Sequence, residues 1–138
     1  MILEQDVNFN SEALFAEAMK ASKNAYAPFS GFEVGAALLT GSGEIYTGVN
    51  VENSSYGATI CAERTAFVKA ISEGEREFEA IAVYAEGTES IPCGICRQFM
   101  FEFAPDITVI TGVHGQFMNI RKLSELLPIG FRLEGEKK

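Results

Sequence analysis

The chain has 138 residues and a formal net charge of −8, and 47% of its residues are hydrophobic, as expected for one domain over residues 1–138. The acidic excess repels phosphate backbones, so we expect no nucleic-acid partner. Apolar runs such as residues 34–39 are too short to span a bilayer, and no basic segment followed by an apolar run opens the chain. We therefore expect a cytoplasmic protein without a membrane partner, with flexible ends at residues 1–9 and 134–138.

The predicted elements alternate along the chain. Apolar residues recur at helical spacing between 14 and 22, with Asn10 or Ser11 as cap, and predict a helix that ends before Pro28. A β-hairpin is expected next, turning at residues 41–43. Its strands are expected at residues 33–40 and 44–51. The elements expected after it are a helix (61–74), a strand (80–85), a helix (93–103), two strands (106–113 and 116–121) and a helical turn (123–127). This order predicts a single-domain, layered α/β fold, with a mixed five-stranded sheet packed between helices.

Three cysteines are too few, and odd in number, for a secreted disulfide framework. Cys93 and Cys96 form a C-x-x-C pair at the start of one predicted helix, and Cys61 begins another. Three thiols presented by two helix starts can converge on one Zn²⁺ and leave its fourth position open for water, as in catalytic zinc sites. A C-x-x-C pair by itself also fits a redox pair or simple packing.

Two charged residues follow Cys61. Glu63 can point into a cleft beside a metal and move protons there, although a glutamate in a first helical turn usually only compensates the helix dipole. Arg64 can donate to a thiolate sulfur and offset the excess negative charge of Zn²⁺ with three thiolates. Without the neighbouring cysteines, a surface arginine paired with an acid would be the simpler interpretation.

Four segments together resemble a known family. They are residues 26–30 (YAPFS), 48–53 (GVNVEN), 61–65 (CAERT) and 92–98 (PCGICRQ). The chain resembles the short, homotetrameric, zinc-dependent cytidine deaminases from about residue 26 to residue 131. The resemblance implies a cytidine deaminase-like fold, one Zn²⁺ per subunit and a homotetramer with shared active sites.

The resemblance also implies roles for individual residues. The zinc ligands would be Cys61, Cys93 and Cys96, Glu63 would be the proton shuttle, and Arg64 would hydrogen-bond the ligand sulfurs. Asn50 and Glu52 would hold the ribose 3′-hydroxyl, Phe32 would pack against the base, and the backbone of Ala62 would contact the pyrimidine carbonyl edge. Tyr56 and Phe131 would reach into the site of a neighbouring subunit. Taken singly, Phe32 and Phe131 also fit ordinary core residues, and Glu52 an exposed acid at a strand end.

The expected activity is hydrolysis of free cytidine and deoxycytidine to uridine and deoxyuridine with release of ammonia, in pyrimidine salvage. A carboxylate such as Glu52 in the sugar site favours nucleosides over nucleotides. The alternative is a related zinc deaminase acting on a modified cytidine or a blasticidin-type cytosine antibiotic. A structural zinc module or an RNA-binding module fits poorly with three metal ligands and a net charge of −8. A polynucleotide deaminase is also disfavoured, because the sequence shows no basic or aromatic groove for a strand.

Overall fold

The computed structural model describes residues 1–136. Five strands form one mixed sheet: β1 (Val34–Thr40), β2 (Ile45–Val49), β3 (Phe78–Ala85), β4 (Thr108–Val113) and β5 (Phe117–Lys122). Their order across the sheet is β2-β1-β3-β4-β5, and only β3 and β4 pair in parallel within it.

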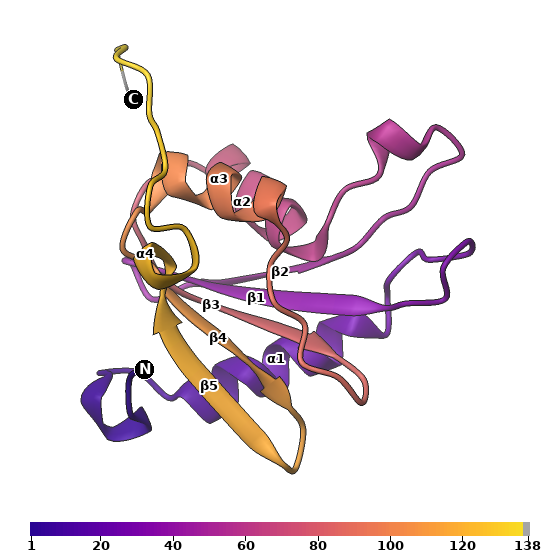
Figure 1. Ribbon diagram of the computed structural model, residues 1–138, viewed down its shortest axis with the longest axis horizontal. Coiled ribbons are helices and arrows are strands. Elements are labelled where there is room, and N and C mark those ends of the chain that lie inside the picture. The colour runs from indigo at the N-terminus through magenta and orange to yellow at the C-terminus, as the bar shows by residue number, and fades with distance from the viewer. Residues whose placement is uncertain (137–138) are drawn as a thin grey trace.

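Helices cover both faces of this sheet. They are α1 (Ser11–Ser22), α2 (Ala62–Ser72), α3 (Gly94–Phe103) and the short α4 (Leu123–Leu126). Helix α1 packs on one face, and α2 and α3 lie side by side on the other (Figure 1). This arrangement confirms the expected layered α/β fold. None of the helices in residues 1–136 is both long enough and apolar enough to cross a bilayer.

The larger of the two hydrophobic clusters lies between the sheet and helices α2 and α3. Phe67 is completely buried at its centre, and its ring packs against Phe78, Phe99 and Phe103. Burial of such a side chain contributes roughly 2–3 kcal/mol to folding. Helix α2 is thereby fixed against α3, and the N-termini of both helices are held on the same side of the sheet.

A glycine brings α2 close to the sheet. Gly48 lies on β2, and a Cβ atom at this position would clash with the carbonyl of Ala62 and the amide nitrogen of Ala66. Only glycine therefore permits this approach of strand and helix. The contact sets the height of the α2 N-terminus, where Cys61 stands, relative to the sheet.

The second strand is shorter than expected. We expected it to reach residue 51, but β2 ends at Val49. The side chain of Asn50 explains the difference, because its Oδ1 accepts a hydrogen bond from the Val34 N–H (2.9 Å) and its Nδ2 donates to the Phe32 carbonyl (2.7 Å). These side-chain bonds take the place of further strand pairing.

Two 3₁₀ turns were not expected from the sequence, whereas the helical turn expected at residues 123–127 is present as α4. A 3₁₀ turn, η1, spans Glu4–Asp6, and a second, η2, spans Tyr56–Ala58. Near the N-terminus, the amide of Ile2 donates to the carbonyl of Ile120 on edge strand β5 (2.8 Å). The flexible ends remain a prediction about motion in solution, and residues 137 and 138 of the expected C-terminal end lie outside the described part of the chain.

Candidate zinc and catalytic site

The three cysteines converge at the N-termini of two neighbouring helices. Cys61 is the N-cap of α2, Cys93 is the N-cap of α3, and Cys96 lies in the first turn of α3. Their Sγ atoms all lie within 4.8 Å of one another. Thiolate sulfurs are preferred zinc ligands, and helix N-termini stabilise thiolates, so this donor set fits one Zn²⁺ with a fourth position left open.

Electrostatic coupling among the thiols favours binding of a cation. A hydrogen bond from Cys96, followed by the effect of Arg64, lowers the pKa of Cys61 to about 5, although partial burial opposes the shift. The same bond and burial raise the pKa of Cys96. Metal ions bind the thiolate form of cysteine, so the lowered pKa of Cys61 favours binding of a divalent cation at this site.

Glu63 lies in the first turn of α2, two residues after Cys61, and only 4% of its surface is exposed. Burial, with a smaller contribution from the charge of Cys61, raises its pKa to about 7. The Cys61 and Cys96 thiols both affect the pKa of Glu63, so the carboxyl group lies near the cysteine cluster. A carboxyl group with this pKa can both accept and return a proton near neutral pH.

Arg64 extends alongside the thiols. Its guanidinium NH2 donates to the Sγ of Cys61 (3.5 Å), and this bond raises the pKa of the arginine. Its Nε is buried and has no hydrogen-bond partner among the described residues. The positive charge therefore lies where it offsets the negative charge of the cysteine cluster.

A polar pair lies at the end of β2. Glu52 Oε1 accepts hydrogen bonds from the amides of Phe29 (2.9 Å) and Ser30 (3.1 Å), and the Ser30 hydroxyl donates to Oε2. The Ser30 hydroxyl has the largest effect on the carboxyl and lowers its pKa. Asn50 holds the same loop through its bonds to Val34 and Phe32. Both side chains thus have a structural role that sequence reasoning did not anticipate.

This polar pair is joined to the cysteine site through the backbone. Val51 and Ile60 exchange two hydrogen bonds (2.9 and 3.0 Å), and Ile60 immediately precedes Cys61. Ala62, the first residue of α2, is completely buried, and its N–H is among the first amides of the helix, which have no partner within it. The sugar-site candidates and the metal-site candidates therefore border one another.

The three aromatic candidates all lie outside the core. The exposed fraction is 46% for Phe32, 79% for Tyr56 and 66% for Phe131. Tyr56 contacts Phe29 edge to face, with ring centroids 6.2 Å apart. The loop that carries η2 and the C-terminal segment lie at opposite ends of the long axis of the molecule (Figure 1). The segments that carry these two residues thus lie apart within one chain.

Three residues near Cys93 and Cys96 were given no role from the sequence. Arg97 Nε donates to the Pro92 carbonyl (2.7 Å) and its NH1 to the Leu126 carbonyl (2.8 Å). Gln98 bonds the backbone of Phe131, and Glu89 bonds side chains of β4 and β5. Arg97 and Gln98 belong to the PCGICRQ segment, which is the only local signal, whereas Glu89 has none because its partners are distant in sequence.

Known proteins with a similar sequence have a zinc-binding region, in agreement with the cysteine cluster. Residues 9–112 match the family model of the cytidine and deoxycytidylate deaminase zinc-binding region. The chain belongs to this family of zinc-binding deaminases. With the cluster of Cys61, Cys93 and Cys96, family membership identifies zinc as the cofactor.

Individual relatives match over most of the chain. The chain is 49% identical over 126 residues to the cytidine deaminase of Halalkalibacterium halodurans, covering 89% of this chain and 95% of that protein. It is similar to a crystal structure of cytidine deaminase from Burkholderia pseudomallei, with a TM-score of 0.83, 44% identity, and coverage of 87% of this chain and 98% of that one. It is 34% identical over 107 residues to the blasticidin-S deaminase of Bacillus cereus, covering 71% of this chain and 76% of that protein.

Proposed function

We propose that the chain hydrolyses free cytidine and deoxycytidine to uridine and deoxyuridine with release of ammonia. The observation that carries this proposal is the buried carboxyl group of Glu63, with its pKa raised to about 7, beside three convergent thiols. The similarity to proteins named cytidine deaminase supports the same substrates.

The chain's own residues move the protons. Zinc held by Cys61, Cys93 and Cys96 would supply Lewis-acid activation of a water molecule. Glu63 removes a proton from that water and delivers it to ring N3, while the water oxygen attacks C4. Glu63 then transfers the remaining proton of that oxygen to the amino group, the C4–N bond breaks, and ammonia leaves. Arg64 offsets the charge of the thiolates throughout.

The hydrogen-bonding capacity of the sugar-site pair suits a hydroxyl group. Three of the four acceptor positions of the Glu52 carboxylate are used by Phe29 and Ser30, which leaves one free. Asn50 keeps one N–H and one acceptor position beyond its two bonds. A ribose 3′-hydroxyl can donate to Glu52 and accept from Asn50, whereas a phosphate at that position would be repelled.

We further propose a homotetramer in which Tyr56 and Phe131 complete the site of a neighbouring subunit, with Phe32 packing against the base in its own subunit. Phe32, Tyr56 and Phe131 are all exposed, so their side chains are available for contacts outside the core of their own subunit. We also propose that the protein is a cytoplasmic enzyme of pyrimidine salvage with one Zn²⁺ per subunit and no membrane partner. The net charge of −8 supports the absence of a nucleic-acid partner, because an acidic surface repels phosphates.

The second candidate is deamination of a modified cytidine or a blasticidin-type antibiotic. Its support is the 34% identity to a blasticidin-S deaminase, which is lower than the 49% identity to a cytidine deaminase. The free acceptor position of Glu52 beside Asn50 favours a substrate with an unmodified ribose.

The test is ammonia release by zinc-loaded protein. Cytidine, deoxycytidine, cytosine, the 5′-monophosphates of both nucleosides and blasticidin S are supplied separately, with the Glu63→Gln protein as a matched blank. We expect the two nucleosides to have the highest kcat/KM. A higher kcat/KM for blasticidin S would establish the second candidate, and a higher value for a monophosphate would overturn the nucleoside assignment.

A further inference from the structure

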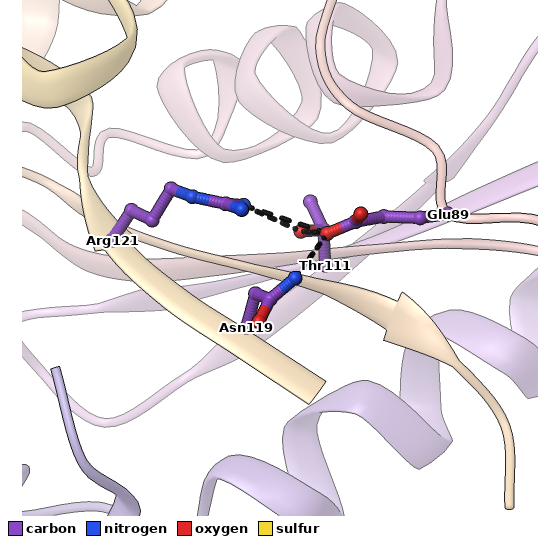
Figure 2. A network of polar contacts seen from close by, with 4 residues as sticks. All are labelled: Glu89, Thr111, Asn119 and Arg121. Atoms are coloured by element: carbon purple, nitrogen blue, oxygen red, sulfur yellow. Dashed lines mark hydrogen bonds and ion pairs between the residues drawn. The ribbon is translucent and has the colours of Figure 1, made fainter. Parts of the chain in front are cut away.

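A four-residue polar network lies behind the segment that leads to Cys93 and Cys96. The segment of residues 86–92 leaves the carboxyl end of β3 and leads to Cys93. At its middle, the Glu89 side chain points back toward the sheet (Figure 2). Its Oε2 accepts hydrogen bonds from Thr111 Oγ1 (2.7 Å) and Asn119 Nδ2 (2.8 Å), and Arg121 NH1 lies 3.4 Å away as an ion pair. We call these four residues the Glu89 network.

The sheet presents the three partners of Glu89 on one face. Thr111 of β4 lies opposite Asn119 of β5, and Arg121 lies two residues further along β5, so alternation places all three on the same side. Val109, opposite Arg121, belongs to the cluster beneath α2 and α3, so this side is the one that carries the cysteines. The network therefore lies beneath the segment of residues 86–92 that leads to Cys93.

Burial makes the network specific for a carboxylate. Thr111 is completely buried, so its hydroxyl depends on Glu89 to accept its hydrogen bond. The same hydroxyl accepts a hydrogen bond from Arg121 NH1 (3.3 Å). All three partners converge as donors on one oxygen, and a neutral side chain at position 89 cannot balance the charge of Arg121. None of these four groups has a part in the proposed proton transfers, so the network has another purpose.

The position of Cys93 depends on this segment. Cys96 is buried and Cys61 is half-buried, so core packing holds them, but Cys93 is exposed. Thr88 bridges back to Ala85 at the start of the segment, and Arg97 holds the Pro92 carbonyl at its end. Glu89 holds the middle and ties it to β4 and β5.

We infer that Glu89 is a positioning residue for the zinc site: its carboxylate, bound to Thr111, Asn119 and Arg121, holds the segment so that Cys93 meets Cys61 and Cys96. Anchoring of this kind lowers the rate at which a ligand leaves its metal, because the thiolate cannot swing away with its backbone. The inference rests on the proposed ligand set and is independent of which nucleoside is the substrate.

The test measures zinc release from the folded, zinc-loaded protein in excess chromophoric chelator. Glu89→Ala should release zinc on the order of 10-fold faster than the unchanged protein. The matched control is Glu75→Ala, because Glu75 likewise accepts hydrogen bonds, from Ser42 and Tyr46, but beyond the far end of α2. The control should lower the melting temperature without changing the release rate. Equal release rates in Glu89→Ala and the unchanged protein would overturn the inference, as would equal acceleration in the control.

Milder variants keep the test decisive if Glu89→Ala does not fold. Glu89→Gln keeps an oxygen that can accept from Thr111 and Asn119 but loses the ion pair, so its release rate should rise less than that of Glu89→Ala. Asn119→Ala removes one donor and should raise the rate by a few-fold. In the cobalt-substituted protein, both should weaken the thiolate-to-cobalt absorption. Unchanged rates and spectra in both variants would overturn the inference, whereas an unchanged protein that binds no zinc would instead contradict the ligand set.

Discussion

The side-chain amide of Gln98 holds the backbone of Phe131 at two points. Gln98 Nε2 donates to the Phe131 carbonyl (2.8 Å), and the Phe131 N–H donates to Gln98 Oε1 (3.5 Å). Phe131 is nevertheless 66% exposed. The helix that begins at Cys93 thus fixes the backbone of this residue while leaving the residue exposed, as a contact to another subunit requires.

The first prediction follows from this relationship. Glu63→Ala and Phe131→Ala proteins should each be weakly active alone, because one lacks the proton shuttle and the other lacks a neighbour's ring. When they are unfolded and refolded together with zinc, some hybrid sites combine an intact Glu63 with an intact Phe131. Deamination by the mixture should therefore exceed the sum of the two parents.

The control for this experiment is refolding each parent by itself under the same conditions. Mass spectrometry of the intact assemblies establishes that hybrids have formed. If hybrids are present and activity does not rise, Phe131 serves its own chain and the proposed sharing of sites is wrong.

The second prediction concerns Glu63. Glu63→Gln keeps the shape of the side chain but cannot accept a proton, so kcat should fall roughly 10²-fold or more. Zinc content, measured by elemental analysis, should stay the same because Glu63 is not a proposed ligand. Near-normal turnover by a zinc-loaded Glu63→Gln protein would remove Glu63 from the mechanism.

The third prediction concerns the metal. Elemental analysis of the unchanged protein should find about one zinc per chain, since three thiols converge on one position. Substituting Cys61, Cys93 or Cys96 by Ala should lower zinc content and activity together. Full deaminase activity in protein stripped of zinc by a chelator would contradict the metal assignment.

The fourth prediction concerns substrate discrimination by Glu52. Glu52→Gln removes the negative charge beside the proposed 3′-hydroxyl position. It should therefore narrow the gap in kcat/KM between cytidine and cytidine 3′-monophosphate more than the gap between cytidine and the 5′-monophosphate. If Glu52→Gln changed kcat/KM equally for the 3′- and 5′-monophosphates, Glu52 would not lie beside the 3′-hydroxyl.

The fifth prediction concerns pH and the loop held by Glu52. Because the Ser30 hydroxyl bond lowers the pKa of Glu52, the unfolded chain binds this proton more readily than the folded protein does. The carboxylate therefore stabilises the fold above its ordinary pKa of 4.5, and this contribution is lost as the pH falls through the lower folded value. The melting temperatures of the unchanged protein and Glu52→Gln should differ most near neutral pH and converge in acid. A constant difference across this range would contradict the role of the charge.

Local sequence patterns determined the order of the elements and much of the candidate site. The apolar period of residues 14–22 predicted α1, and the cysteines at positions 61 and 93 marked the starts of two helices, which the structure confirms as N-caps. Such signals are readable because helical turns and caps depend on residues within about four positions of one another. The clustering of Cys61 with Cys93 and Cys96 could be anticipated because their types and spacing suit one metal ion.

Only the tertiary structure decided which side chains support that site. Glu89 and Thr111 are 22 residues apart, and Gln98 and Phe131 are 33 apart, so neither pair has a local period or spacing to reveal it. Tertiary contact also ended β2 at Val49, because the Asn50 side chain bonds to the amide of Val34. These contacts form only once the sheet has brought distant strands and loops together, and their energy depends on burial that no single segment possesses by itself.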